Sequence, residues 1–216
     1  MRLMDYSAGF GNECKSTCDV TEQRGAPRYT SLIRSAKLVC GQGEFLCVIR
    51  DVSATGISLR TFHELPQDQA ISLQLQNGES YGLQEIRRAG NEASYQFDRP
   101  VAVDRLIHET WNFPKRQLRL NIAIPLTLST LSQQAEAETV NLSQQGARVS
   151  CEASFALDQT LRVASPSFRE TRATVRWRKN GHYGLVFDNT FSLREFALMT
   201  AAVQCPAMLQ QDPGAA

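Results

Sequence analysis

The strongest constraint on the fold is an internal duplication with a spacing of 90 residues. The hexapeptide Asp51–Gly56 (DVSATG) is matched by Asn141–Gly146 (NLSQQG), and Phe97-Asp98 is matched by Phe187-Asp188 at the same spacing. Apolar residues between these strings repeat in phase, namely Ile57, Leu59 and Ile71 with Ala147, Val149 and Leu161. A period this long exceeds a solenoid unit of about 20–50 residues. It therefore predicts two tandem copies of one small domain.

Both copies carry the signals of β-strands. Residues 172–178 alternate polar with apolar side chains, and this period of two predicts a strand with one buried face. Trp177 shares the apolar phase, so we expect it to pack inward and not to stack on a base. Asn180-Gly181 follows as a hairpin turn. In the first copy, residues 71–76 alternate in the same way before the turn Asn77-Gly78.

Short strands about ten residues apart predict a mainly β fold, with a barrel or a sandwich in each copy. Each copy is expected to end in a short helix, at 104–109 and at 192–205. In the second helix, Ser192 and Glu195 have the spacing of a capping box. The predicted organisation is a flexible tail, two domains and a second flexible tail, at 1–20, 21–110, 115–205 and 206–216.

Charge and cysteine content argue against several classes of protein. Lys and Arg number 23 against 22 Asp and Glu, so a nucleic-acid polymer or a membrane surface is not expected to be held by bulk charge. The six cysteines include no CxxC pair and, with three histidines, no zinc spacing. Because no export signal and no apolar stretch of about 18 residues is visible, we expect reduced thiols, a cytoplasmic location and no membrane insertion.

A candidate ligand site surrounds the first copy of the hexapeptide. Arg24 and Arg28 lie on a segment broken by glycine and proline, which predicts a loop. Asp51 and Ser53 are two positions apart on a strand, so their side chains share one face, and Gly56 permits a tight turn. Guanidinium groups bind phosphates and the O6 and N7 atoms of guanine, whereas a carboxylate accepts from the guanine N–H groups. The cluster therefore suits a small anion with aromatic heads.

The combination of RxxxR at Arg24 and Arg28 with DxSxxG at Asp51–Gly56 resembles the PilZ domain. This family is a bacterial receptor module for the second messenger cyclic di-GMP (c-di-GMP). The resemblance extends over residues 24–109 and 115–203. It implies two tandem six-stranded antiparallel β-barrels, each with a short C-terminal helix. It also implies that the arginine loop wraps the ligand against the outer face of the barrel.

The resemblance also implies a role for each motif residue of the first copy. Arg24 and Arg28 would bind guanine edges and phosphates, and Asp51 and Ser53 would bind a guanine head. Gly56 would keep the backbone close to the ligand. A simpler interpretation stays open for the hexapeptide, because Asp and Ser also bond their own backbone in turns and glycine can serve the turn alone.

The second copy departs from the family pattern at one position. Lys115 stands where the first arginine is expected, although its spacing to Arg119 is kept. Lysine is a point charge that forms no bidentate fork and does not stack as a plane. Asn141 replaces the aspartate, which the pattern allows, and Ser143 and Gly146 remain. We therefore expect the second copy to bind c-di-GMP more weakly or to be degenerate.

Together these observations predict a c-di-GMP receptor or effector that acts on a downstream protein partner, without enzymatic activity, metal or cofactor. The alternative is a PilZ-like structural adaptor that has kept the fold and acts through protein contacts alone. An enzyme has no supporting constellation in the sequence, because paired carboxylates, a glycine-rich phosphate loop and a metal cluster are all missing.

Overall fold

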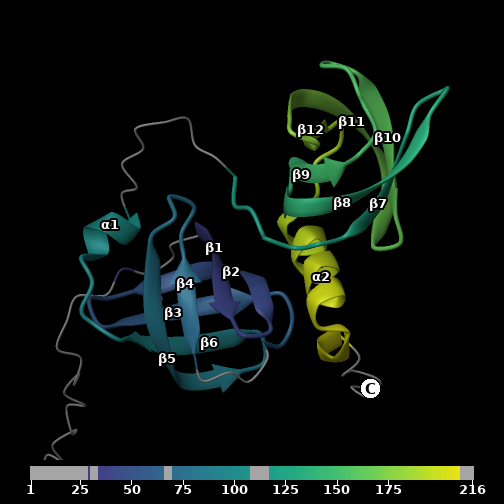
Figure 1. The fold of residues 1–216 in the computed structure, drawn as a ribbon. Helices are drawn as coiled ribbons and strands as arrows, with labels where there is room; N and C mark the ends of the chain where they lie inside the picture. Colours follow the sequence, from purple (N-terminus) through teal and green to yellow (C-terminus); the bar gives the residue numbers. More distant parts are fainter. Residues whose placement is uncertain (1–28, 30–33, 66–69, 108–116, 210–216) are drawn as a thin grey trace, which may run out of the picture.

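The computed structural model describes residues 29, 34–65, 70–107 and 117–209, and these form two closed β-barrels (Figure 1). In barrel 1 six antiparallel strands close in the order β1-β2-β3-β6-β5-β4. Their bounds are β1 (Arg34–Cys40), β2 (Gly43–Val52), β3 (Gly56–Thr61), β4 (Ile71–Gln74), β5 (Ser80–Ala89) and β6 (Glu92–Phe97). A short helix follows, α1 (Val103–Ile107).

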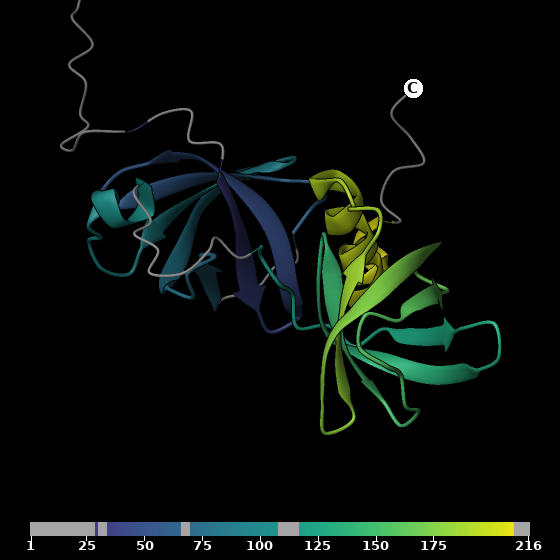
Figure 2. The ribbon, with the colours of Figure 1, turned by 90° about the horizontal axis from the view of Figure 1, so that it is seen from above.

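Barrel 2 repeats this topology, with its strands in the order β7-β8-β9-β12-β11-β10. Figure 2 shows the two barrels from above. Its strands are β7 (Pro125–Ser129), β8 (Gln134–Ser143), β9 (Gly146–Cys151), β10 (Thr160–Ser165), β11 (Phe168–Lys179) and β12 (His182–Phe187). Helix α2 (Leu193–Gln204) follows, and then a 3-10 helix at Pro206–Leu209. The prediction of two six-stranded antiparallel barrels with a C-terminal helix is confirmed. The predicted domain boundaries at residues 21, 110 and 115 lie outside the described residues.

Local sequence explains several of these elements. Both residues of the Asn180-Gly181 turn have a positive φ, which the β11–β12 hairpin requires. The predicted capping box of α2 is present, because the Glu195 amide donates to Ser192 Oγ and the Ser192 amide donates to the Glu195 carboxylate. The apolar residues that repeat in phase are all buried, at Ile57, Leu59, Ile71, Ala147, Val149 and Leu161.

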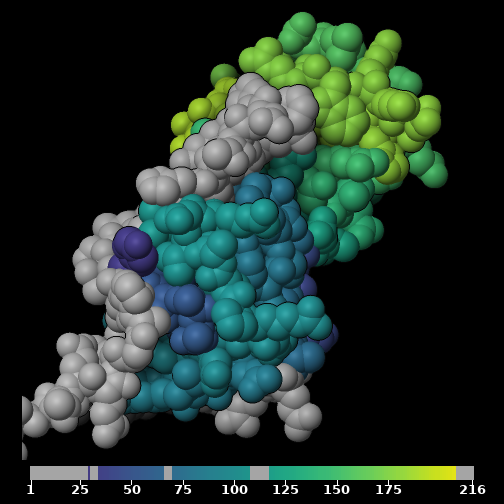
Figure 3. Space-filling model, turned by 90° about the vertical axis from the view of Figure 1, so that its left-hand side faces the viewer, coloured from purple at the N-terminus to yellow at the C-terminus, as the bar shows by residue number. Residues whose placement is uncertain are grey.

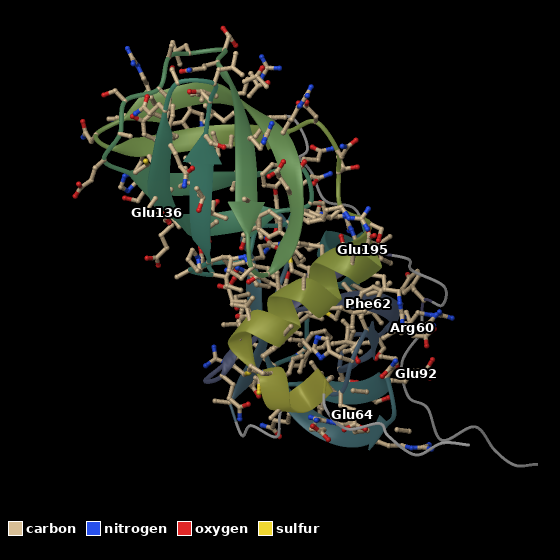
Figure 4. All side chains as sticks on the ribbon, turned by 90° about the vertical axis from the view of Figure 1, so that its right-hand side faces the viewer. Arg60, Phe62, Glu64, Glu92, Glu136 and Glu195 are labelled. Carbon is tan, nitrogen blue, oxygen red and sulfur yellow. The ribbon has the colours of Figure 1, made fainter. Side chains whose placement is uncertain are left out.

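Helix α2 belongs to barrel 2 and also packs against barrel 1. Phe196 and Ala197 lie in the buried cluster of barrel 2, one turn before Ala201, which lies in the cluster of barrel 1. From barrel 1, Leu46 and Phe62 pack into the cluster of barrel 2, and α2 crosses in front of this region in Figure 4. In space-filling form the residues of barrel 1 lie below those of barrel 2 (Figure 3). The two barrels therefore share apolar packing.

A polar contact set beside α2 also joins the barrels, and we call Lys37, Glu44 and Asn121 the interdomain latch. Lys37 Nζ donates to Glu44 Oε2 at 2.7 Å and to the Arg119 carbonyl at 3.2 Å. The backbone and side-chain amides of Asn121 donate to the same carboxylate at 2.8 and 2.9 Å. Gln204 exchanges two hydrogen bonds with the backbone of Glu44. Only 6% of the Lys37 side chain and 14% of the Glu44 side chain are exposed, so water screens this pair weakly.

The described residues bear on two other expectations. None of the described helices has the length and apolarity needed to cross a membrane. The four cysteines in the described part of the chain are free thiols: Cys40, Cys47, Cys151 and Cys205. Burial raises the pKa of the Cys47 thiol well above its usual range, so this group stays protonated and unreactive near neutral pH.

Candidate functional site

In barrel 1 the repeated hexapeptide forms a tight turn between β2 and β3. The Ser53 amide donates to the Gly56 carbonyl at 2.8 Å, and the Gly56 amide donates to Ser53 Oγ at 3.1 Å. Asp51 and Ser53 are half-buried, as is Gly56. Ser53 therefore has the turn-capping role that its residue type favours.

The equivalent turn in barrel 2 shares one contact with the turn in barrel 1, where Ser53 Oγ also donates to the Gly56 carbonyl at 3.3 Å. Ser143 Oγ donates to the Gly146 carbonyl at 3.0 Å, and Ser143 is buried. Each turn is also bonded to the last strand of its barrel, β6 or β12. The Phe97 amide donates to the Thr55 carbonyl, and the Phe187 amide donates to the Gln145 carbonyl. The hexapeptide thus connects the last strand of each barrel to the strand pair on which the candidate site lies.

A single backbone bridge brings the end of each basic segment to the hexapeptide. Tyr29 directly follows Arg28, and it exchanges two hydrogen bonds with Val52, at 2.9 and 3.0 Å. In barrel 2, Leu120 exchanges the same pair with Leu142, at 2.8 and 2.9 Å. In both barrels the bridged position lies between the first and third residues of the hexapeptide. The chain segments that carry the two motifs therefore meet in space.

The basic side chains themselves are only partly described. Arg24, Arg28 and Lys115 lie outside the described residues, so their predicted contacts stay predictions. Arg119 is exposed, and its carbonyl accepts from Lys37 of the interdomain latch. The second basic segment therefore ends at the junction of the two barrels.

Beside the hexapeptide, one row of residues crosses the outer face of each barrel, and we call it the outer row. A β-bulge between Ile49 and Asp51 turns Asp51 outward. From there the pairing runs across β2, β3, β6 and β5, so that the outer row of barrel 1 contains Asp51, Ser58, Ser94 and Arg87. The hydroxyl groups of Ser58 and Ser94 are 3.4 Å apart. This row is polar along its whole length.

The outer row of barrel 2 has different chemistry at the same positions. Bulges recur in phase, and the row contains Asn141, Arg148, Gly184 and Trp177. The Trp177 ring lies over Gly184, where a Cβ atom would stand 1.9 Å from the indole Nε1. The Arg148 guanidinium carbon is 6.0 Å from the centroid of the indole ring, within cation–π range.

The expectation that Trp177 packs inward is wrong. The bulge between Val175 and Trp177 inserts one residue into β11, and an extra residue reverses the face of every side chain that follows. Trp177 is consequently 40% exposed on the outer face. Strict alternation in the sequence hides this reversal. An equivalent bulge lies 90 residues earlier in barrel 1, between Glu85 and Arg87, but only the pairing of the strands reveals either bulge.

The two motif glycines differ in how much space they leave, and this predicts different costs of substitution. A Cβ atom at Gly146 would lie 2.1 Å from the Leu185 carbonyl oxygen, whereas one at Gly56 would lie 3.3 Å from the Tyr95 carbonyl oxygen. Gly146→Ala is expected to lower the free energy of unfolding by about 1–3 kcal/mol, the usual cost of overpacking. Gly56→Ala should cost clearly less. Urea unfolding of both variants measures the difference, and equal costs would contradict this geometry.

A family model described as the PilZ domain matches residues 22–91 and 114–203. Each matched segment contains one basic segment followed by one hexapeptide, as expected for two copies of the same domain. The search of curated proteins found no match to this chain.

Several solved structures show a weak likeness. PlzA of Borreliella burgdorferi, solved in complex with c-di-GMP, is 13% identical, with 79% of this chain and 86% of that chain covered and a TM-score of 0.33. The inhibitor of motility MotI/DgrA of Bacillus subtilis is 10% identical, with 84% and 99% covered and a TM-score of 0.34. YcgR of Escherichia coli, in complex with c-di-GMP, is 11% identical, with 77% and 81% covered and a TM-score of 0.27.

Proposed function

Since this chain belongs to the PilZ domain family, we propose that it is a receptor for c-di-GMP whose main binding site lies on barrel 1. Arg24 and Arg28 hold the ligand against Asp51 and Ser53. The observation that carries the proposal is the bridge from Tyr29 to Val52, because it joins the end of the arginine segment to the second residue of the hexapeptide.

The residue types fit the chemistry of this ligand. Each guanidinium group donates bidentate hydrogen bonds to a phosphate or to O6 and N7 of guanine. The carboxylate of Asp51, turned outward by the bulge in β2, accepts from the N1–H and N2–H₂ groups of the same base. Fixing a loop costs about 1–2 kcal/mol per residue in backbone entropy, and charge-assisted hydrogen bonds of this kind offset the cost.

In barrel 2 the same proposal gives a weaker site. Lys115 replaces the first arginine and supplies charge without a planar fork. The site is still connected to barrel 1, because Lys37 donates to the carbonyl of Arg119, in the second basic segment. Ligand binding at residues 115–119 would therefore act on the interdomain latch, change the relative placement of the barrels and present a new surface to a downstream protein partner.

Isothermal titration calorimetry of the purified protein tests the proposal. We expect c-di-GMP to release saturable heat, and the number of sites per chain to separate one working barrel from two. Cyclic di-AMP is the matched control, because adenine presents an amino donor where guanine presents O6, and it should bind much more weakly. If c-di-GMP releases no heat in the absence of any partner protein, the proposal that the chain is a receptor is rejected.

The departure at Lys115 favours a second candidate function, a structural adaptor that acts through protein contacts and binds no nucleotide. The same titration separates the two candidates, because an adaptor gives no heat with c-di-GMP. We propose no catalytic residue, metal or cofactor for either function.

A further inference from the structure

We propose that Cys40 and Cys205 are a modification site, at which a hydroperoxide forms a reversible disulfide bond that fastens helix α2 to barrel 1. Cys40 is the last residue of β1 in barrel 1, and Cys205 is the C-cap of α2, which belongs to barrel 2. This inference goes beyond the proposed function and involves no residue of the candidate ligand site.

The β1–β2 hairpin is the part of barrel 1 that meets the end of α2. The side-chain amide of Gln204 exchanges two hydrogen bonds with the backbone of Glu44, both at 2.8 Å. The Cys205 thiol donates to Gln42 Oε1 at 3.7 Å. Gln42 lies in the two-residue turn that follows Cys40. Both cysteines therefore lie beside the same hairpin turn.

Strand pairing places the Cys40 side chain on the face of the hairpin that meets α2. Cys40 pairs directly with Gly43, and directly opposed residues have Cβ atoms about 4.5–5.5 Å apart on the same face. A Cβ atom at Gly43 would lie 3.4 Å from the Gln204 Cβ atom. The Cβ atoms of Cys40 and Gln204 are therefore at most about 9 Å apart, and Cys205 is the residue after Gln204.

The end of α2 has the freedom that the bond requires. A disulfide needs Cβ atoms about 3.5–4.5 Å apart, so the two cysteines must approach each other. Cys205 has left the helical conformation, with φ −147° and ψ 76°, and helix ends fray. Its side chain can therefore turn toward Cys40 while Ala201, buried one turn earlier in the cluster of barrel 1, keeps the helix in place.

Burial distinguishes this pair from the other described cysteines. Cys40 and Cys205 are half-buried, and both pack against the apolar cluster of barrel 1. A small oxidant can reach them, because part of each residue is exposed. Cys47 and Cys151 are buried, so we expect them to react slowly with the same oxidant.

Hydrogen peroxide is a sufficient oxidant for this bond. The thiolate of one cysteine attacks a peroxide oxygen, the O–O bond breaks, and a sulfenic acid and one water molecule form. The second thiolate attacks the sulfenic sulfur, the S–S bond forms, and the sulfenic oxygen leaves as a second water molecule. The two thiols together lose two electrons, and their protons end in the two water molecules. A thiol reductant reverses the reaction by exchange.

The disulfide would add a covalent bond to the junction between the barrels. It would lie beside the hydrogen bonds from Gln204 to Glu44, a residue of the interdomain latch. Cys205 is 163 positions from Gln42 in the chain, and a cross-link between such distant segments constrains the unfolded chain strongly. We therefore expect the oxidised protein to unfold at a higher urea concentration than the reduced protein.

The test treats the full chain with hydrogen peroxide and analyses it without a reducing agent. We expect a faster monomer band in denaturing gel electrophoresis, which dithiothreitol removes, and a linked peptide pair containing Cys40 and Cys205 in mass spectrometry. Cys40→Ser and Cys205→Ser should each abolish both signals. The double variant Cys14→Ser with Cys18→Ser is the matched control, because it removes two cysteines outside the pair, and it should leave both signals unchanged.

Each other outcome overturns the proposal. A treated protein without the linked peptide pair, or with links through other cysteines or between two chains only, shows that this site does not form. An equal urea midpoint of the oxidised and reduced proteins shows that the bond does not fasten α2 to barrel 1. Thermal unfolding verifies that each variant is folded before treatment. The calorimetric titration with c-di-GMP is a separate measurement, so failure of the disulfide leaves the proposed function standing.

Discussion

Arg28→Ala is expected to abolish the tighter c-di-GMP binding that we propose for barrel 1. Loss of one partner of a hydrogen-bonded charge pair costs about 2–5 kcal/mol, which weakens binding at least about 30-fold. Arg28 immediately precedes Tyr29, the residue that is bridged to Val52, so it is adjacent in sequence to the residue that pairs with the hexapeptide. Calorimetry of the variant should show only the weaker c-di-GMP binding that we assign to barrel 2.

Two variants control this prediction. Arg28→Lys keeps the charge and removes the planar fork, so binding should stay impaired if bidentate contacts matter. Lys115→Ala, at the corresponding basic segment of barrel 2, should change the tighter phase little. Unchanged affinity in Arg28→Ala would show that the arginine loop is solvated and takes no part in the site.

Glu44→Ala is expected to destabilise the junction between the barrels. The carboxylate accepts from Lys37 and from both amides of Asn121, so its removal leaves a nearly buried ammonium group without its counter-charge. Breaking a buried ion pair in this way costs about 3 kcal/mol. We expect urea unfolding to begin at lower denaturant and small-angle X-ray scattering to show a wider distribution of interbarrel distances.

Glu92→Ala is the matched control for the interdomain latch. Glu92 is an exposed carboxylate on barrel 1 (Figure 4), and no ion pair of this residue is present in the described structure. Its removal should cost less than about 0.5 kcal/mol, as surface substitutions usually do. Equal effects of the two substitutions would mean that the latch contributes nothing to the contact between the barrels.

The duplication predicted much of the architecture because it is expressed in local patterns. Residues such as Leu59 and Val149 recur in phase on the buried face of equivalent strands. The Asn180-Gly181 turn and the Ser192 capping box are formed by residues close together in the chain, and both were predicted from their residue types. The candidate ligand residues of the hexapeptide were located by the same repeat, although their contact with a ligand stays a proposal.

The outward position of Trp177 could not be predicted in this way. It depends on a bulge in β11, and a bulge is a property of how two strands pair and not of one strand alone. The interdomain latch is also non-local, because Glu44 meets Asn121 across 77 positions and Gln204 across 160. The chain's local patterns thus specify its two barrels and their turns. The shared face between the barrels and the outer row of barrel 2 exist only after folding, because strand pairing and helix packing bring together residues that no short-range pattern relates.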